Sequence, residues 1–165
     1  MKIYTKKGDL GQTDLLKRRV KKNDLHIEIN GQLDEVMASI LLTKQYIEQT
    51  DVFAQLDQIH HTLYQMAYEI ALDDDKQIKV FEEDVIWLEK AIDDMDNKLE
   101  PLTKFIQLDQ NKAAAWINMS RVKVRTAERF MIHLDDVKIV NPFTLKYLNR
   151  LSDYFFTLGR IYNKS

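Results

Sequence analysis

Near its N-terminus the chain carries residue types and spacings suited to holding an anion such as a polyphosphate. Gly8 and Gly11 stand three residues apart, and a basic stretch follows at residues 17–22. Glycines permit backbone conformations in which several N–H groups point at one anion. The hydroxyls of Thr5 and Thr13 and the nearby lysines would add direct contacts. A Gly-x-x-Gly spacing alone is weak, so a flexible basic tail is an equally good interpretation of these residues.

A second segment suited to anions lies at residues 118–129. At about 100° per residue along a helix, one arc collects Asn118, Arg121, Arg125, Glu128 and Arg129. Guanidinium groups bind carboxylates and phosphates through two parallel hydrogen bonds. The alternative is a solvated helix face, on which neighbouring charges contribute only about 0.2–0.5 kcal/mol per pair. On these residues alone, the solvated face is the stronger interpretation.

A third segment, residues 31–35, combines a glycine with two acids. Gly31 falls early in an expected helix, where glycine costs about 1 kcal/mol relative to alanine, so a purpose for its missing side chain is expected. Asp34 and Glu35 have the character of ordinary surface acids. The four histidines form no ligand set, and the paired Glu-x-x-His motifs of a di-iron bundle are absent.

The candidate residues of the second and third segments are expected to lie on helices, because glycine and proline are nearly absent after the first fifth of the chain. The sequence has four glycines and two prolines, and three of the glycines precede residue 32. Apolar residues at helical spacing predict an all-α, five-helix bundle of up-and-down helices. Asn141 and Pro142 are typical of a helix start. We expect one domain over 1–165, comprising an N-terminal segment (1–24) and a bundle (25–165), with helices at about 25–49, 52–72, 82–99, 111–134 and from 142 onwards.

Bulk composition narrows the function classes. With 24 basic and 26 acidic residues among 165, the net charge of −2 gives no reason to propose a nucleic-acid partner, and any anion site must be local. The chain has no cysteine, which excludes disulfides and thiolate metal sites. No apolar run is long enough for a membrane span. We therefore expect a cytoplasmic protein with no nucleic-acid or membrane partner.

Taken together and in this order, the motifs resemble those of the PduO-type ATP:cob(I)alamin adenosyltransferases, and the resemblance runs nearly end to end. The residues that carry it are 4–13 (YTKKGDLGQT), 31–35 (GQLDE), 85–89 (VIWLE), Phe105 with Ile106, the 121–129 run ending in Ala127-Glu128-Arg129, and 147–156 (YLNRLSDYFF).

The resemblance implies a five-helix bundle that assembles as a homotrimer with active sites between subunits. It implies that the N-terminal loop wraps the triphosphate of ATP together with Mg²⁺, which is bound mainly through the phosphates. It also implies that Arg121 pairs with Asp34 of the adjacent subunit, that Arg125 contacts phosphate, and that Phe105 displaces the lower base from cobalt. The other implied ATP-binding residues are Thr5, Lys6, Gly8, Asp9, Gly11, Gln12, Thr13, Lys21 or Lys22, and, near the adenosine, Glu128 and Asn149.

The activity that the resemblance implies is transfer of the 5′-deoxyadenosyl group of ATP to cob(I)alamin, formed by reduction of cob(II)alamin. A cobalamin reductant and an adenosylcobalamin-dependent enzyme would then be partners. The sequence departs from the family pattern where Phe-x-Leu-Pro-Gly-Gly is usual, since residues 107–111 read Gln-Leu-Asp-Gln-Asn, and Asn118 replaces a histidine. This departure predicts weakened activity or, as the alternative, a non-catalytic sensor or carrier of ATP or adenosylcobalamin.

Overall fold

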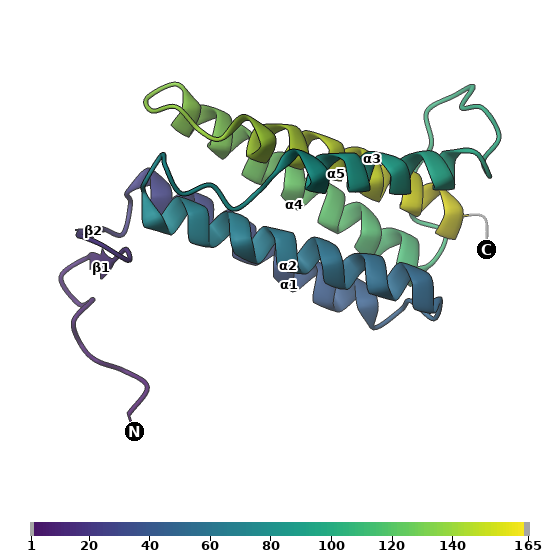
Figure 1. The fold of residues 1–165 in the computed structure, drawn as a ribbon. Coiled ribbons are helices and arrows are strands. Elements are labelled where there is room, and N and C mark those ends of the chain that lie inside the picture. The colour runs from purple at the N-terminus through teal and green to yellow at the C-terminus, as the bar shows by residue number, and fades with distance from the viewer. Residues whose placement is uncertain (1, 164–165) are drawn as a thin grey trace.

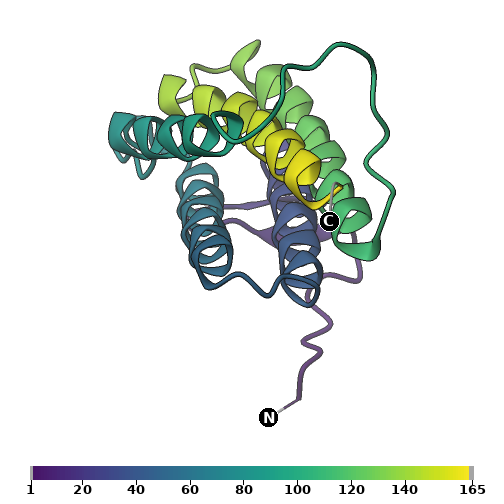
Figure 2. The same ribbon diagram turned by 90° about the vertical axis from the view of Figure 1, so that its right-hand side faces the viewer.

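The computed structural model describes residues 2–163 and consists mainly of five helices (Figure 1). They are α1 (Leu25–Lys44), α2 (Thr50–Leu72), α3 (Glu82–Asp96), α4 (Lys112–Asp135) and α5 (Pro142–Tyr162). Seen along the bundle, α1 and α2 form one layer and α3, α5 and α4 form the other (Figure 2). Helix α4 packs against both α1 and α5, so it joins the two layers.

The apolar stripes of the helices meet between these layers. Along α4 the buried positions are Ala113, Ala114, Ile117, Ser120, Val124, Ala127, Met131 and Leu134, which confirms the spacing expected for this helix. Buried Ser120 is hydrogen-bonded, because its Oγ lies 3.2 Å from both Thr43 Oγ1 and Trp116 O. These buried residues define the core-facing side of α4, so the arginines of residues 121–129 lie on its outward side.

Helix starts agree with the sequence more closely than helix ends. Asn141 accepts a hydrogen bond from Phe143 N and precedes Pro142, as the sequence predicted. The first helix stops at Lys44 rather than residue 49, because Gln45, Tyr46 and Ile47 donate to carbonyls three residues back. Ile47 is nevertheless buried, so this apolar residue packs into the core from the turn after α1 and not from the helix itself. The third helix ends at Asp96 rather than at 99.

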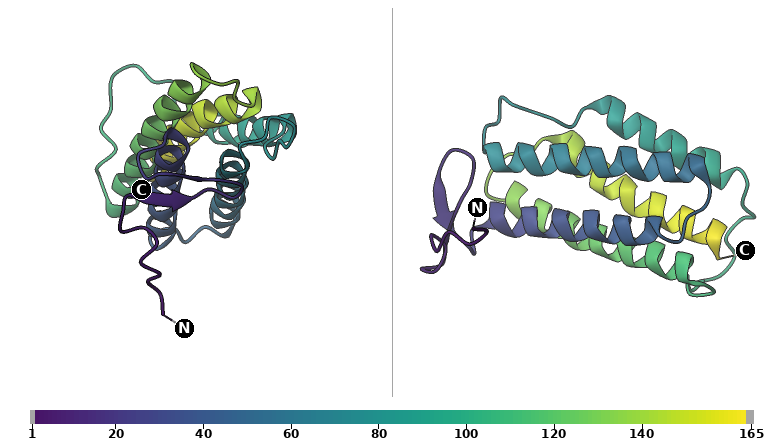
Figure 3. Two further views of the ribbon diagram at one scale, coloured as in Figure 1. Left: turned by 90° about the vertical axis from the view of Figure 1, so that its left-hand side faces the viewer. Right: turned by 90° about the horizontal axis from the view of Figure 1, so that it is seen from below.

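The N-terminal segment contains a small β-hairpin, which the sequence did not predict. Strands β1 (Gln12–Asp14) and β2 (Arg19–Lys21) pair antiparallel, with Thr13 opposite Val20. The hairpin lies against the end of the bundle where α1 begins (Figures 1 and 3). Strands of three residues are too short to show an alternating apolar pattern in the sequence. In the structure, burial of Leu15 and Val20 shows that the hairpin packs against the rest of the chain.

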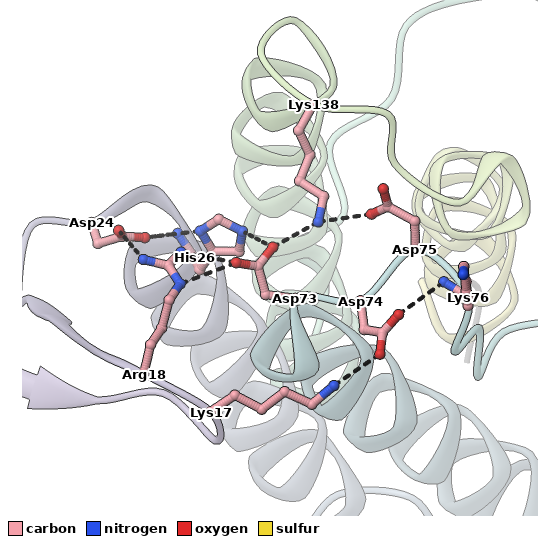
Figure 4. A network of polar contacts seen from close by, with 9 residues as sticks. All are labelled: Lys17, Arg18, Asp24, His26, Asp73, Asp74, Asp75, Lys76 and Lys138. Carbon is pink, nitrogen blue, oxygen red and sulfur yellow. Dashed lines mark hydrogen bonds and ion pairs between the residues drawn. The ribbon is translucent and has the colours of Figure 1, made fainter.

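Ion pairs also attach the hairpin to the bundle (Figure 4). Lys17 Nζ lies 2.8 Å from Asp74, and Arg18 Nη2 lies 3.0 Å from Asp73. Asp73 lies at the C-terminal cap of α2 and also accepts from Lys138 Nζ at 2.6 Å. The hydrogen bond from Lys138, helped by His26 and Arg18 and opposed by burial, lowers the pKa of Asp73 to about 2.

This lowered pKa predicts acid sensitivity. A folded-state pKa below the unfolded value of 3.8 stabilises the fold above about pH 4, and that contribution disappears as the pH falls towards 2. At about 1.4 kcal/mol per pKa unit, we expect Asp73→Asn to remove about 2 kcal/mol of unfolding free energy at neutral pH. The loss should vanish near pH 2. Urea unfolding at several pH values measures it, with Asp93→Asn, an exposed acid on α3, as control; an equal loss at all pH values would contradict the electrostatic origin.

Candidate active site

The glycine-bearing segment adopts tight turns rather than an extended tail. Gly11 has φ +77° and Lys6 has φ +61°, so both occupy the left-handed region that glycine tolerates best. The N–H of Asp9 donates to Lys6 O at 3.3 Å, and that of Gly11 to Gly8 O at 3.1 Å. These two N–H groups therefore serve turns inside the segment in this structure, whereas the sequence interpretation had them facing an anion.

The basic residues after this segment divide into two groups. Lys17 and Arg18 are paired with acids of the bundle, whereas Lys21 and Lys22 extend from β2 beside the turn. A Cβ at Gly8 would lie 3.1 Å from Lys22 Nζ, so this ammonium packs directly over the glycine. Lys21 pairs with Gln12 across the hairpin, so both lysines that the sequence proposed lie beside the predicted phosphate loop, and Lys22 is the one whose ammonium packs over Gly8.

Arg19 is a residue that sequence reasoning missed. Its guanidinium donates to Gln12 Oε1 at 3.3 Å and Asp14 Oδ1 at 2.7 Å, and also to Lys7 O. Arg19 thus ties the predicted phosphate loop to β1. In the sequence, Arg19 is only one residue of a basic stretch. Such a stretch does not show whether an arginine hydrogen-bonds to a loop of its own chain or binds an anion.

None of the three arginines on the outward face of α4, Arg121, Arg125 and Arg129, forms an ion pair within residues 2–163. Arg121 is half-buried and donates to Asn118 Oδ1 at 2.9 Å, and Arg125 is exposed. Within residues 2–163 no carboxylate lies at ion-pair distance from either guanidinium. Burial lowers the pKa of Arg121, and the neighbouring charge of Arg125 lowers it further. Such a pair gains stability when an anion approaches it.

A hollow of about 310 Å³ lies beside Arg121. It is lined by Phe105, Ile106, Gln107, Leu108, Asp109, Asn118, Arg121 and Phe156. Phe105 is 90% exposed, although large apolar side chains are normally buried. The structure therefore brings together, at one surface hollow, Phe105 and Arg121, two residues to which the family resemblance assigned roles.

Other predicted residues stay apart within one chain. Within the described residues, no hydrogen bond or ion pair joins the N-terminal segment to α4, and Asp34 on α1 is exposed with no ion pair. Its neighbour Glu35 instead pairs with Lys123 of α4. The hydrogen bonds and ion pairs of the described residues therefore do not join these predicted residues into one site.

Comparison with known proteins decides the family. Residues 3–162 match the family described as cobalamin adenosyltransferase. The chain belongs to this family. A corrinoid adenosyltransferase of Bacillus subtilis is 36% identical over 168 residues, spanning 99% of this chain and 87% of that relative. The chain is therefore an enzyme of the transferase class.

Solved structures of the family agree with this assignment. A variant PduO-type ATP:co(I)rrinoid adenosyltransferase of Lactobacillus reuteri, complexed with ATP, superposes with a TM-score of 0.91 at 32% identity, covering 98% of this chain and 94% of that one. A second variant, complexed with cobalamin and ATP, gives 0.90 at 32% identity, with 99% and 94% covered.

Two further adenosyltransferase-site residues named from the sequence meet across the α4–α5 seam. Asn149 Nδ2 donates to Glu128 Oε1 at 2.9 Å. Arg150 donates to Asn149 Oδ1 at 2.7 Å and to Glu89 Oε1 at 2.9 Å. Asp153 lies one turn after Asn149, and burial raises its pKa; the charge of Glu128 adds to this rise, and the charges of Arg150 and Arg125 oppose it. The sequence analysis assigned no role to Arg150 or Asp153; for Asp153, the one-turn spacing after Asn149 was a usable signal.

The segment 105–111 lacks the family's usual Pro-Gly-Gly turn, and side chains hold it instead. Asn163 Oδ1 accepts from the N–H groups of Asp109 and Gln110, both at 3.1 Å, and Asn163 Nδ2 donates to Gln107 O at 3.0 Å. Leu108 is buried against Gly159, where an added Cβ would lie 2.7 Å from Leu108 Cδ1. Although the Pro-Gly-Gly turn is missing, this segment is therefore attached to the C-terminal end of α5.

We predict that Gly159→Ala destabilises the protein even though alanine favours helices. The new methyl must displace Leu108, and overpacking of this kind costs about 1–3 kcal/mol, against about 1 kcal/mol gained in helix propensity. In a Leu108→Ala background the same substitution should become stabilising. Urea unfolding of the two single variants and the double variant measures this coupling. Equal effects in both backgrounds would show that Leu108 does not occupy the space above Gly159.

Two features of the described part of the chain, residues 2–163, concern metals and membranes. No group of three or more His, Asp or Glu side chains could hold a metal ion there. No helix there combines the length and apolarity that a bilayer span requires.

Proposed function

We propose that the chain transfers the 5′-deoxyadenosyl group of ATP to cob(I)alamin, releasing triphosphate and forming adenosylcobalamin. The nucleophile is Co(I), which supplies both electrons of the new Co–C5′ bond. The C5′–O5′ bond breaks, and the triphosphate leaves with its electron pair. Because the substrate is the nucleophile, the protein needs no side-chain base. Its work is to align the reactants and to stabilise the departing charge.

One observation carries the proposal: Arg121, which forms no ion pair within the described residues, lines a hollow together with Phe105 and Phe156, in a chain that superposes on a cobalamin- and ATP-bound relative. Arg125 would hold the triphosphate together with residues Thr5 to Thr13 and Lys22. Glu128 and Asn149 would orient the adenosine. Phe105 would enter the axial position of the corrin and displace its lower base, which makes cobalt(II) easier to reduce.

The same proposal includes a homotrimer. Asp34 and Arg121 each lack an ionic partner within the described chain, and their helices expose large apolar residues, among them Leu41, Leu42, Met119 and Val122. Exposed apolar surface of this kind is typical of subunit contacts. Pairing of Arg121 with Asp34 of the partner subunit would neutralise both groups. Light scattering of the purified protein tests this assembly.

Mg²⁺ is proposed to arrive with the nucleotide. Mg²⁺ keeps several waters and is commonly held through substrate phosphates and one or two carboxylates. Asp9, exposed in the glycine-bearing segment, is the carboxylate nearest in sequence to the proposed phosphate contacts. The ion would neutralise charge on the triphosphate. A cytoplasmic location also belongs to the proposal and is supported by the absence of cysteine.

The deciding experiment mixes the protein with ATP, Mg²⁺ and chemically reduced cobalamin and records the absorption spectrum of adenosylcobalamin as it forms. Turnover above a protein-free control supports transfer. A protein that binds ATP in calorimetry yet gives no turnover would instead fit the second candidate, a sensor or carrier of ATP or adenosylcobalamin. The altered residues 107–111 are the observation that favours this second candidate.

A further inference from the structure

Asp73, at the C-terminal cap of α2, occupies a position that is locally unfavourable for it. Its backbone is left-handed, with φ 48° and ψ 48°, a conformation that Asp adopts more readily than most other residues. It is also the first of three consecutive acids at a helix C-terminus, where the helix dipole disfavours negative charge. A carboxylate that opposes the helix dipole indicates that another interaction requires it.

That interaction is a junction of three segments (Figure 4). The carboxylate of Asp73 lies 3.0 Å from Arg18 Nη2 of the hairpin, 3.1 Å from His26 Nε2 of α1, and 2.6 Å from Lys138 Nζ after α4. Its side chain is 23% exposed, so water screens these contacts less than it screens open surface pairs. Asp73 therefore joins the hairpin to two separate parts of the bundle.

The hairpin connects this junction with the predicted phosphate loop. Arg18 belongs to the turn between β1 and β2, and Leu15 N donates to Arg18 O at 2.8 Å across that turn. At the open end of the hairpin, Lys22 N donates to Gly11 O at 2.9 Å. The backbone of Gly11 and Gln12 is thus held relative to the bundle through a two-stranded hairpin. Such a hairpin is at best marginally stable alone in water.

We propose that Asp73 is a positioning residue for the nucleotide: by holding the hairpin turn through Arg18, it orders the glycine-bearing segment before ATP arrives. The proposal rests on the proposed function, in which this segment binds the triphosphate. When the attachment is lost, ATP binding must itself order the segment, and this ordering weakens affinity. The chemical step is unaffected, because Asp73 does not touch the reactants.

Two variants remove the attachment from opposite sides. Asp73→Gly removes the carboxylate while supplying the residue that best tolerates the left-handed cap, so α2 should still end normally. Arg18→Met removes the hairpin cation that faces Asp73 and leaves the cap and the Lys17–Asp74 pair unchanged. Lys138→Met is the matched control, since it removes another cation from Asp73 without touching the hairpin. Circular dichroism establishes that all three variants fold.

Two readouts are combined, both on the full chain. Hydrogen exchange of the amides of Leu15 and Lys22 reports hairpin docking, and calorimetry with Mg²⁺-ATP reports affinity. For Asp73→Gly and Arg18→Met we expect at least tenfold faster exchange and about tenfold weaker ATP binding. For the same two variants we expect kcat within twofold of wild type, and the double variant should lose no further ATP affinity. For Lys138→Met we expect ATP affinity within twofold of wild type.

Three outcomes would overturn the proposal. Unchanged ATP affinity in Asp73→Gly, with faster hairpin exchange, would make Asp73 a purely structural residue. A tenfold loss of affinity in Lys138→Met as well would point to general destabilisation. A wild-type protein that binds no ATP would overturn the proposed function itself, and the positioning role with it, whereas wild-type binding with unaffected variants would overturn the positioning role alone.

Discussion

Arg125→Ala is expected to weaken ATP binding by about 10- to 100-fold. A charge-assisted hydrogen bond to phosphate is worth about 1.5–3 kcal/mol, and each 1.4 kcal/mol corresponds to a tenfold change in affinity. Arg125 is exposed and has no ion pair within the described residues, so its truncation should leave the melting temperature nearly unchanged. Isothermal calorimetry with Mg²⁺-ATP provides the measurement.

The matched control is Arg129→Ala. Arg129 lies one turn further along α4, is also exposed, and donates to Thr126 Oγ1. Its removal subtracts the same charge from the same helix, so we expect an affinity change below about threefold from the long-range charge effect, which salt screens. Equal losses in the two variants would show that α4 supplies only diffuse positive charge and no phosphate contact at Arg125.

Phe105→Ala is expected to slow adenosyl transfer to cobalamin by about 100-fold or more while leaving ATP affinity unchanged. A 100-fold loss corresponds to about 2.7 kcal/mol in the barrier. The physical reason is that alanine cannot fill the axial position, so the lower base stays on cobalt and hinders its reduction. Because the Phe105 side chain is 90% exposed, its removal should cost little stability. The assay starts from cob(II)alamin with a reductant and follows the formation of adenosylcobalamin.

Two controls isolate this axial effect. A corrinoid that lacks the lower base has nothing to displace, so Phe105→Ala should process it at close to the wild-type rate. Leu102→Ala truncates another exposed apolar residue in the same connection between α3 and α4 and should leave transfer unchanged. If the variant is slow with both corrinoids, Phe105 acts through corrin binding or loop structure rather than at the axial position.

These two variants also distinguish an enzyme from a carrier. A carrier of ATP would respond to Arg125→Ala in binding but would show no transfer for Phe105→Ala to reduce. The attachment of residues 107–110 to Asn163 bears on this question, because it holds the segment that carries Phe105 despite the missing Pro-Gly-Gly turn.

Features that depend on near neighbours were predictable from the sequence. The buried stripe of α4 follows from helical periodicity, and the start of α5 follows from Asn141 and Pro142. The same periodicity placed Arg121 and Arg125 on one outward face, because side chains three to four residues apart share a face of any α-helix. Helix ends were less predictable: the residues after Lys44 turn through local hydrogen bonds that leave no apolar pattern.

Features that depend on distant neighbours were decided only by the tertiary structure. Asp73 and Arg18 lie 55 residues apart, Glu128 and Asn149 lie 21 apart, and Leu108 meets Gly159 across the fold. In the sequence Asp73 is one acid among three, and its left-handed cap is invisible. A contact between helices depends on their relative placement, which the whole core sets, whereas periodicity and capping depend on only a few consecutive residues. Thus the sequence by itself determined which residue types were present and which helix faces carried them, and the packing of the bundle decided which of them meet.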